Sequence, residues 1–295
     1  MTRHFCQIFV PVLLVGSAHA AAPIPSFEAL LIQPDGTTQR AYLVTATQAS
    51  IRYRESKDAG EIKDRQLSEL ASVHVFEPRE YSAAMDLFQA RRYQEAKQSF
   101  AAIKDLYAPI STLKDNPGTL AAFYELECFR KLGDLGGLSE ALKKFNKDPL
   151  VREHQHRQIE MDIFWDAVRT KDWTRLESLA KDRQKQRLPG YQRAQVSYCY
   201  ALALEGLGKP TEALDAYDTA LTADLGASAE IARNSALAIL RIHLADPAVK
   251  SALKQGTAPA DQVKLREAQA IARLYQLSLG AGEPLPAEYQ VFLKE

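Results

Sequence analysis

The hydrophobic pattern of the chain changes character near residue 80. Residues 27–76 hold short β-branched and aromatic runs separated by turn residues, which is typical of strands. From Tyr81 onward, apolar residues recur at the i, i+3, i+4 spacing of amphipathic helices. The pattern therefore predicts a mainly α-helical protein with a small β-domain over residues 27–77, a helical domain over residues 81–280, and a tail with a short helix over residues 281–295.

The predicted β-domain contains four or five short strands. Pro34 and Gly36 favour a reversal between the first two, because proline presets φ and glycine accepts a positive φ. A looser turn is predicted near residues 57–60. Such strands form a meander, or close into a small barrel of the SH3 or Sm-like type that removes exposed edges. Gly36, Leu43 and Ile51 resemble the first Sm motif, but the second motif has no counterpart, so only the barrel shape is carried over.

A helix-turn-helix arrangement occurs four times in the helical region. Ala96, Leu138, Leu176 and Ala213 occupy equivalent points, at intervals of 42, 38 and 37 residues. Small residues such as Ala96 and Ala213 let paired helices approach closely. One such hairpin cannot bury its own apolar face, so at least about three must stack.

Two of these units carry a family resemblance. LEGLGKPTEALDAYDTAL in residues 204–221 and ARRYQEAKQSF in residues 90–100 resemble the tetratricopeptide repeat family. The resemblance implies a right-handed helix-turn-helix solenoid that binds proteins, with the first helix of each pair lining a concave groove. A fifth, divergent hairpin is expected over residues 229–255, followed by a capping helix from Pro259 to Leu279.

Alignment of the four units with the family places ten residues on the predicted groove. In this interpretation, aromatic residues and methionine anchor a peptide, while Arg130 and Arg169 pair with a carboxylate. The alternative interpretation is that the apolar members pack between neighbouring repeats. The predicted groove residues are Tyr81, Met85, Phe123, Glu127, Arg130, Trp165, Arg169, Tyr198, Leu202 and Glu205.

The first twenty residues are predicted to be a secretory signal peptide. Arg3 precedes the apolar run from Phe5 to Val15, and Ala18-His19-Ala20 is an A-x-A cleavage site. The run is too short for a membrane span, which needs about 20 apolar residues. We therefore expect a periplasmic or extracellular protein with no membrane span after cleavage.

Cleavage removes Cys6 and leaves Cys128 and Cys199. These two residues fall in helices of different predicted repeats, whose Cα atoms would lie beyond the limit of about 7 Å for a disulfide. Two buried free thiols are therefore favoured, and a disulfide is the alternative.

Charge balance excludes a general attraction to nucleic acid. Lys plus Arg and Asp plus Glu number 37 each, and no polybasic cluster is present. We therefore predict no nucleic-acid partner, and expect any partner to be recognised locally.

No residue set specifies a reaction. Residues 205–211, EGLGKPT, lack the glycine spacing and the Ser or Thr after lysine of a phosphate-binding loop, so a turn between helices is predicted. His154 and His156 lie two residues apart on a predicted helix and would point to nearly opposite sides, which favours a solvated face over a zinc site. His74 and His243 have no nucleophile motif nearby. We predict no catalytic residues, no metal and no cofactor.

The predicted function is that of a non-catalytic exported module that binds a protein or peptide. The first alternative is a self-associating cell-envelope structural protein, which would form homo-oligomers. The second is an enzyme or carbohydrate-binding protein, which would need a polar pocket between the β-domain and the helices.

Overall fold

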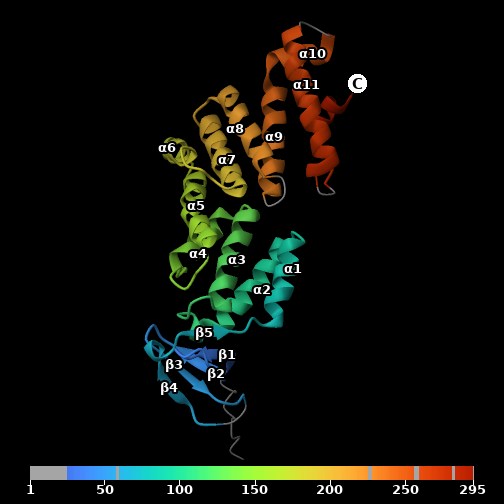
Figure 1. Ribbon diagram of the computed structural model, residues 1–295. Helices are drawn as coiled ribbons and strands as arrows, with labels where there is room; N and C mark the ends of the chain where they lie inside the picture. The colour runs from blue at the N-terminus through green and yellow to red at the C-terminus, as the bar shows by residue number, and fades with distance from the viewer. Residues whose placement is uncertain (1–24, 58–59, 225–227, 256–258, 281–282, 295) are drawn as a thin grey trace, which may run out of the picture.

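The computed structural model describes residues 25–57, 60–224, 228–255, 259–280 and 283–294, and the side chains of residues 255–261 are not described. The predicted signal peptide and part of the predicted turn at residues 57–60 lie outside these ranges. The protein is mainly helical, with an antiparallel sheet at its N-terminal end (Figure 1). A search of the described residues finds no helix with the length and apolar character of a membrane span.

The sheet has the strand order β4-β3-β2-β1-β5, and every neighbouring pair is antiparallel. β1 and β3 alternate buried and more exposed residues, so one face of the sheet is apolar. A short 3-10 helix, η1 (Leu67–Glu69), lies between the last two strands. The strands are β1 (Phe27–Ile32), β2 (Thr38–Ala46), β3 (Ser50–Arg54), β4 (Lys63–Gln66) and β5 (Ser72–Val75).

The reversal predicted between the first two strands is confirmed. Gly36 has a φ of 84°, and the Thr37 backbone N–H donates to Asp35 Oδ1 at 2.9 Å. β4 was not predicted as a separate strand, because its residues Lys63 to Gln66 are all polar and show no apolar alternation. The strand pairing is that of an open sheet, with β4 and β5 at its edges.

Helices run along the molecule away from the sheet, which lies at one end while α10 and α11 lie at the other (Figure 1). Most successive helices pack against each other, most extensively α2 with α3 and α7 with α8. The helices are α1 (Arg79–Gln89), α2 (Tyr93–Leu106), α3 (Pro117–Lys131), α4 (Leu135–Lys144), α5 (Glu153–Thr170), α6 (Trp173–Gln184), α7 (Gly190–Gly206), α8 (Pro210–Ala223), α9 (Ala229–Ala245), α10 (Pro247–Gln255) and α11 (Pro259–Leu274).

The turns within the first four helix pairs share one backbone feature. Each contains a residue in the left-handed conformation, and these residues are Arg91, Gly133, Lys171 and Gly208, with φ of 61°, 71°, 56° and 77°. They are 42, 38 and 37 residues apart, which are the intervals found in the sequence. The segment EGLGKPT is therefore the turn between α7 and α8, as predicted.

The apolar face of the sheet packs on the first helices. The Phe27 and Tyr107 rings lie 4.6 Å apart between centroids, and Ile110, in the 3-10 helix η2 (Ala108–Ile110), belongs to the same cluster as Leu31 and Leu43. This cluster continues into α1, α2 and α3. The sheet and the first helices therefore share one hydrophobic core.

The C-terminal helices differ in detail from the sequence prediction. The predicted helix from Pro259 to Leu279 is α-helical only to Leu274 and ends in a π-helical turn, η3 (Tyr275–Leu279). The predicted tail helix is the 3-10 helix η4 (Ala287–Leu293), which buries Tyr289 and Phe292. Both segments pack against α9 and α11, so tertiary contacts set their geometry.

Candidate functional site

A cavity of about 430 Å³ lies where the first helices of successive pairs converge. Its walls come from the C-terminal end of α1 and the start of α2, one face of α3, the N-terminal turns of α5 and α7, and Ser228, which precedes α9. These helices are far apart in the sequence. The cavity therefore exists only because the tertiary structure brings these elements together.

Aromatic side chains form the wall on the side of α1 and α3. Phe88 packs edge-on against Tyr93 and Tyr124, with ring centroids 5.4 and 5.3 Å apart. Phe123 packs against Tyr124 in the same way at 5.3 Å. Phe88, Tyr93 and Tyr124 are only partly buried, so this wall offers apolar contact area to a ligand.

A buried ionic cluster lies beside the aromatic wall. Arg130 Nη2 is 2.9 Å from Glu127 Oε2 on α3, and its Nη1 is 3.0 Å from Glu230 Oε1 on α9. Lys131 Nζ is 3.1 Å from Glu230 Oε1, and it also lies 5.8 Å from the centre of the Phe88 ring. The side chains of Arg130 and Lys131 are only 4% and 7% exposed. The cluster joins α1, α3 and α9.

Ion pairing favours the charged forms of Arg130 and Glu230. Burial opposes the charged form of Arg130, but Glu127 and Glu230 raise the pKa of Arg130 above its usual value. Burial also works against ionisation of Glu230, yet Arg130 and Lys131 lower the pKa of that carboxyl. For Lys131, burial and the neighbouring Arg130 lower the pKa of the ammonium. The guanidinium of Arg130 already has two carboxylate partners, so it is not a free cation waiting for a ligand.

Two glutamines form the wall on the side of α5 and α7. Gln158 Nε2 donates to Gln195 Oε1 at 3.1 Å, and Gln195 Nε2 donates back to Gln158 Oε1 at 2.9 Å. Trp165 Nε1 also donates to Gln195 Oε1 at 3.1 Å, and the Arg130 guanidinium lies 5.8 Å from the Trp165 ring centre. The amides are therefore held in fixed orientations.

Three of the predicted groove residues line this cavity, namely Phe123, Glu127 and Arg130. Trp165 lies behind the wall, through its contacts with Arg130 and Gln195.

Tyr81 lies one layer deeper, with ring centroids 5.9 Å from Phe100 and 6.4 Å from Tyr124. Met85 is partly buried against the same cluster. These two residues therefore contact the core behind the cavity rather than its open space.

Three further predicted residues lie on α7 beyond the cavity. The Tyr198 ring is 6.2 Å from Trp165 and 5.8 Å from Tyr217 between centroids. Glu205 Oε2 accepts hydrogen bonds from Tyr217 Oη at 2.5 Å and from Arg241 Nη2 at 2.7 Å. Leu202 is partly buried between the same helices. This group connects α7, α8 and α9 and adds no residue to the cavity lining.

Arg169 lies apart from Arg130. Its guanidinium is exposed, pairs with Asp166 Oδ1 at 2.8 Å, and borders a different hollow of about 350 Å³ between α4 and α5. The two arginines therefore line different cavities rather than one groove.

Sequence reasoning missed several lining residues, including Tyr93, Lys131, Gln158 and Gln195. For the glutamines a signal was present, because they are 37 residues apart and thus occupy the same place in consecutive repeats. For Lys131 the sequence offers no signal, since its carboxylate partner lies 99 residues away on α9.

Histidines and cysteines add no chemistry to the site. His154 is exposed at the cavity rim, and His156 Nε2 lies 2.8 Å from the Leu150 carbonyl oxygen. Among the described residues, no group of His, Cys, Asp and Glu has the arrangement of a metal site. Cys128 and Cys199 are buried free thiols. Burial raises the pKa of Cys128 to about 12 and also raises that of Cys199, so both are protonated.

Comparison of the chain with protein-family models, curated proteins and solved structures gives no match. The function is therefore argued from the geometry of the site.

Proposed function

We propose that this protein is an exported, non-catalytic module that binds a protein or peptide segment in the cavity between its first helices. In this proposal the helix pairs form a tetratricopeptide-like right-handed solenoid, and the sheet is a small SH3 or Sm-like domain that covers its N-terminal end. Support for the repeats comes from the left-handed turn residues, which recur at 42, 38 and 37 residues.

The observation that carries the proposal is the convergence of α1, α3, α5 and α7 on one cavity of about 430 Å³. Partly exposed aromatic rings on one wall are the feature of a site that anchors an apolar side chain of a peptide, and the mutually bonded amides of Gln158 and Gln195 fix the shape of the opposite wall. The paired charges of Arg130 and Glu230 hold the walls in place rather than supply a net charge.

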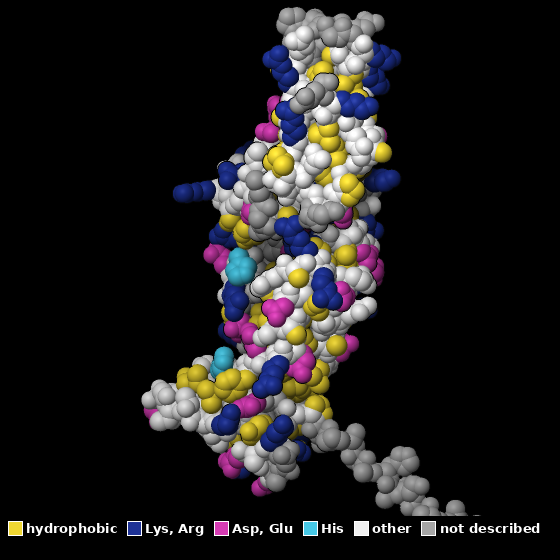
Figure 2. Space-filling model, turned by 90° about the vertical axis from the view of Figure 1, so that its right-hand side faces the viewer, with side chains coloured by type: hydrophobic (Ala, Val, Ile, Leu, Met, Phe, Trp, Pro, Cys, Tyr) yellow, Lys and Arg dark blue, Asp and Glu magenta, His cyan; other side chains and the backbone are white. Residues whose placement is uncertain are grey.

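The outer surface is consistent with recognition at such a local site. Figure 2 shows that positive and negative side chains alternate along the helices on this face, and that hydrophobic side chains gather near the junction with the sheet. A surface of mixed charge does not steer ligands over long distances. Selectivity would therefore come from the cavity itself.

Site-specific photo-cross-linking tests this proposal. We expect p-benzoylphenylalanine at Gln89, an exposed residue of the cavity lining, to cross-link a partner polypeptide in the cell envelope. The same group at Glu140, which is exposed on α4, should not. A product with twice the mass of the chain would instead indicate self-association.

A matched pair of variants on α7 completes the experiment. Tyr191→Ala removes an aromatic side chain from the lining, whereas Tyr200→Ala removes a partly buried tyrosine of the same helix outside it. Loss of the cross-link only in the first variant supports the proposal. Equal yields from both variants, or from Gln89 and Glu140, would contradict it.

A further inference from the structure

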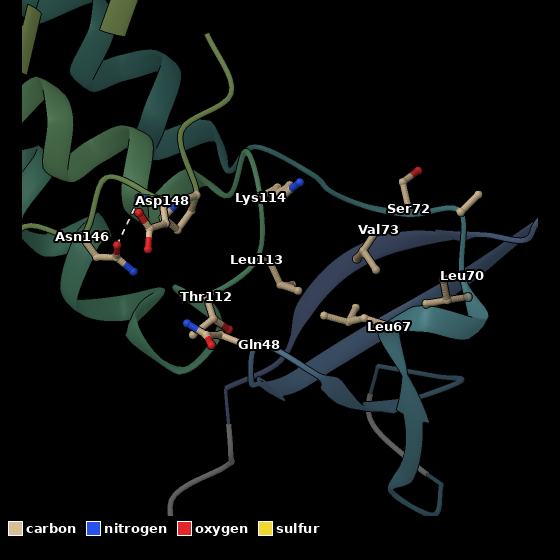
Figure 3. Close-up of a pocket in the computed structure, with 12 residues that line it drawn as sticks. Gln48, Leu67, Leu70, Ser72, Val73, Thr112, Leu113, Lys114, Asn146 and Asp148 are labelled. Carbon is tan, nitrogen blue, oxygen red and sulfur yellow. Dashed lines mark hydrogen bonds between the residues drawn. The ribbon is translucent and has the colours of Figure 1, made fainter. Parts of the chain in front are cut away.

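A second cavity, of about 460 Å³, lies where the sheet meets the loops of the helical region (Figure 3). Leu67, Leu70 and Val73 form its wall on the side of the sheet. Leu113 faces them from the loop before α3 (Figure 3). This part of the cavity lining is therefore aliphatic.

Uncharged polar side chains surround this aliphatic part. Gln48 comes from the turn between β2 and β3, Thr112 from the loop after η2, and Asn146 from the loop between α4 and α5. Lys114 and Asp148 contribute one charge of each sign, so the rim has no net charge. Amide groups, which both donate and accept hydrogen bonds, suit a peptide backbone.

The loop wall of this cavity is rigid. Asn116 is fully buried, and its Nδ2 donates to the Leu113 carbonyl oxygen at 2.6 Å while its Oδ1 accepts from Thr119 N at 2.9 Å. The Asp115 backbone N–H donates to the Pro149 carbonyl oxygen at 2.8 Å, which joins the two loops. The cavity is thus formed before any ligand arrives, which limits the ordering cost of binding.

The sheet edge formed by β5 borders the cavity, and this edge lacks charged residues that would discourage the pairing of another strand. β4 carries Lys63, Asp64 and Arg65, and charged residues of this kind discourage the pairing of another strand. The other edge strand, β5, has the sequence SVHV and carries none of these charges. β5 is therefore the edge that can accept an additional strand.

Strand register identifies the open position on β5. The Phe76 backbone N–H donates to the Glu28 carbonyl oxygen at 3.0 Å. The backbone N–H and C=O groups of even-numbered residues of β5 therefore point toward β1, and those of Val73 point away from it. Val75 is only 4% exposed because its side chain packs in the core on the same face of the sheet, whereas Val73 is only partly buried. The backbone N–H and C=O of Val73, which point away from β1, therefore lie beside the cavity that its own side chain lines.

We propose that this junction is a second binding site, for an extended, uncharged segment of a partner protein that places one aliphatic side chain in the cavity. The segment's backbone pairs with Val73, and its residue opposite Val73 points to the same face of the sheet, toward Leu67 and Leu113. The rim amides of Gln48 and Asn146 hold the adjoining peptide groups. This site is independent of the cavity between the first helices.

NMR titration of the ¹⁵N-labelled full chain tests this inference. The probe is the capped peptide acetyl-Thr-Thr-Leu-Thr-Thr-amide, and the control probe has aspartate in place of leucine. We expect saturable shifts of the Ser72 and Val73 amide signals with the leucine probe only. The absence of such shifts overturns the inference, and shifts confined to Gln158 and Gln195 assign the peptide to the other cavity instead.

Two variants separate the backbone and side-chain contributions. Ala71→Phe fills the cavity from an exposed position. Val73→Pro removes the backbone N–H that points away from β1, and it leaves the backbone hydrogen bonds between β5 and β1 in place. Each should raise the Kd for the probe at least about tenfold. The matched controls are Ala102→Phe, at an exposed position of α2, and Asp64→Pro, on the other edge. An unchanged Kd in both Ala71→Phe and Val73→Pro would overturn the inference.

Discussion

Arg130 of α3 and Glu230 of α9 form a buried ion pair with 3.0 Å between Nη1 and Oε1, although 100 residues separate them. Five helices, α4 to α8, lie between them in the sequence. The chain therefore curves enough for its fifth helix pair to contact the second directly. Because the pair borders the cavity between the first helices, it connects the curvature of the fold to the shape of the site.

Removal of the charge of Glu230 should strongly destabilise the protein. Glu230→Gln removes the carboxylate charge that Arg130 and Lys131 share, and removing one partner of a buried pair costs about 3 kcal/mol. Urea unfolding followed by circular dichroism measures the effect. The control is Glu140→Gln, which breaks an exposed pair with Lys143 and should leave the midpoint unchanged. Similar midpoints for the two variants would show that the buried pair does not hold the fold.

Lys171 should be replaceable by glycine with a gain in stability. It is exposed and has a φ of 56°, a conformation that costs residues other than glycine about 1 kcal/mol. Lys171→Gly should therefore raise the free energy of unfolding by roughly that amount, and Lys171→Ala should not.

Conversely, Gly208→Ala should lower the free energy of unfolding by about 1 kcal/mol. An added Cβ meets no atom within 4 Å, so only the φ of 77° is unfavourable.

Protonation of His243 should weaken the fold. Burial lowers the pKa of its imidazole below 6.5, although Glu267 and Asp246 oppose this change and Lys264 adds to it. The unfolded chain then binds the proton more readily than the folded chain, so stability is complete above about pH 6.5 and is lost as the pH falls toward the folded-state pKa. The free energy of unfolding of His243→Gln should decline less steeply over this range than that of the wild type. Parallel curves would contradict the prediction.

The two buried thiols should be unreactive in the native state. Burial raises the pKa of both Cys128 and Cys199, and the thiolate is the reactive form. Iodoacetamide at neutral pH, followed by peptide mass spectrometry, should modify neither residue without denaturant and both in guanidinium chloride. A peptide that links the two cysteines would show a disulfide and contradict the free thiols.

Local patterns were sufficient for most of the elements and for the repeat intervals. The apolar spacing around Ala96, Leu138, Leu176 and Ala213 predicted the intervals that the left-handed turn residues also show. Periodicity could not reveal β4, because its residues are polar and their strand conformation comes from pairing with β3.

The candidate site was only partly predictable. Alignment with repeat positions found Phe123, Glu127 and Arg130, which line the cavity. It placed Arg169 on the same groove, whereas the structure places Arg169 beside α4. A displacement of one helical position rotates a side chain by about 100°, so an alignment slip in a weakly matched repeat moves a residue to another face.

The sequence by itself determined the local features of this protein: a β-rich start, helix pairs of regular spacing, and the turns between them. These depend on residues close in the chain, through periodicity, turn chemistry and small residues at helix contacts. Only the tertiary structure decided how strongly the pairs curve, and with it the pairing of Arg130 with Glu230 and the cavity beside them. These features depend on contacts between helices that are far apart in the sequence, and no local pattern encodes such contacts.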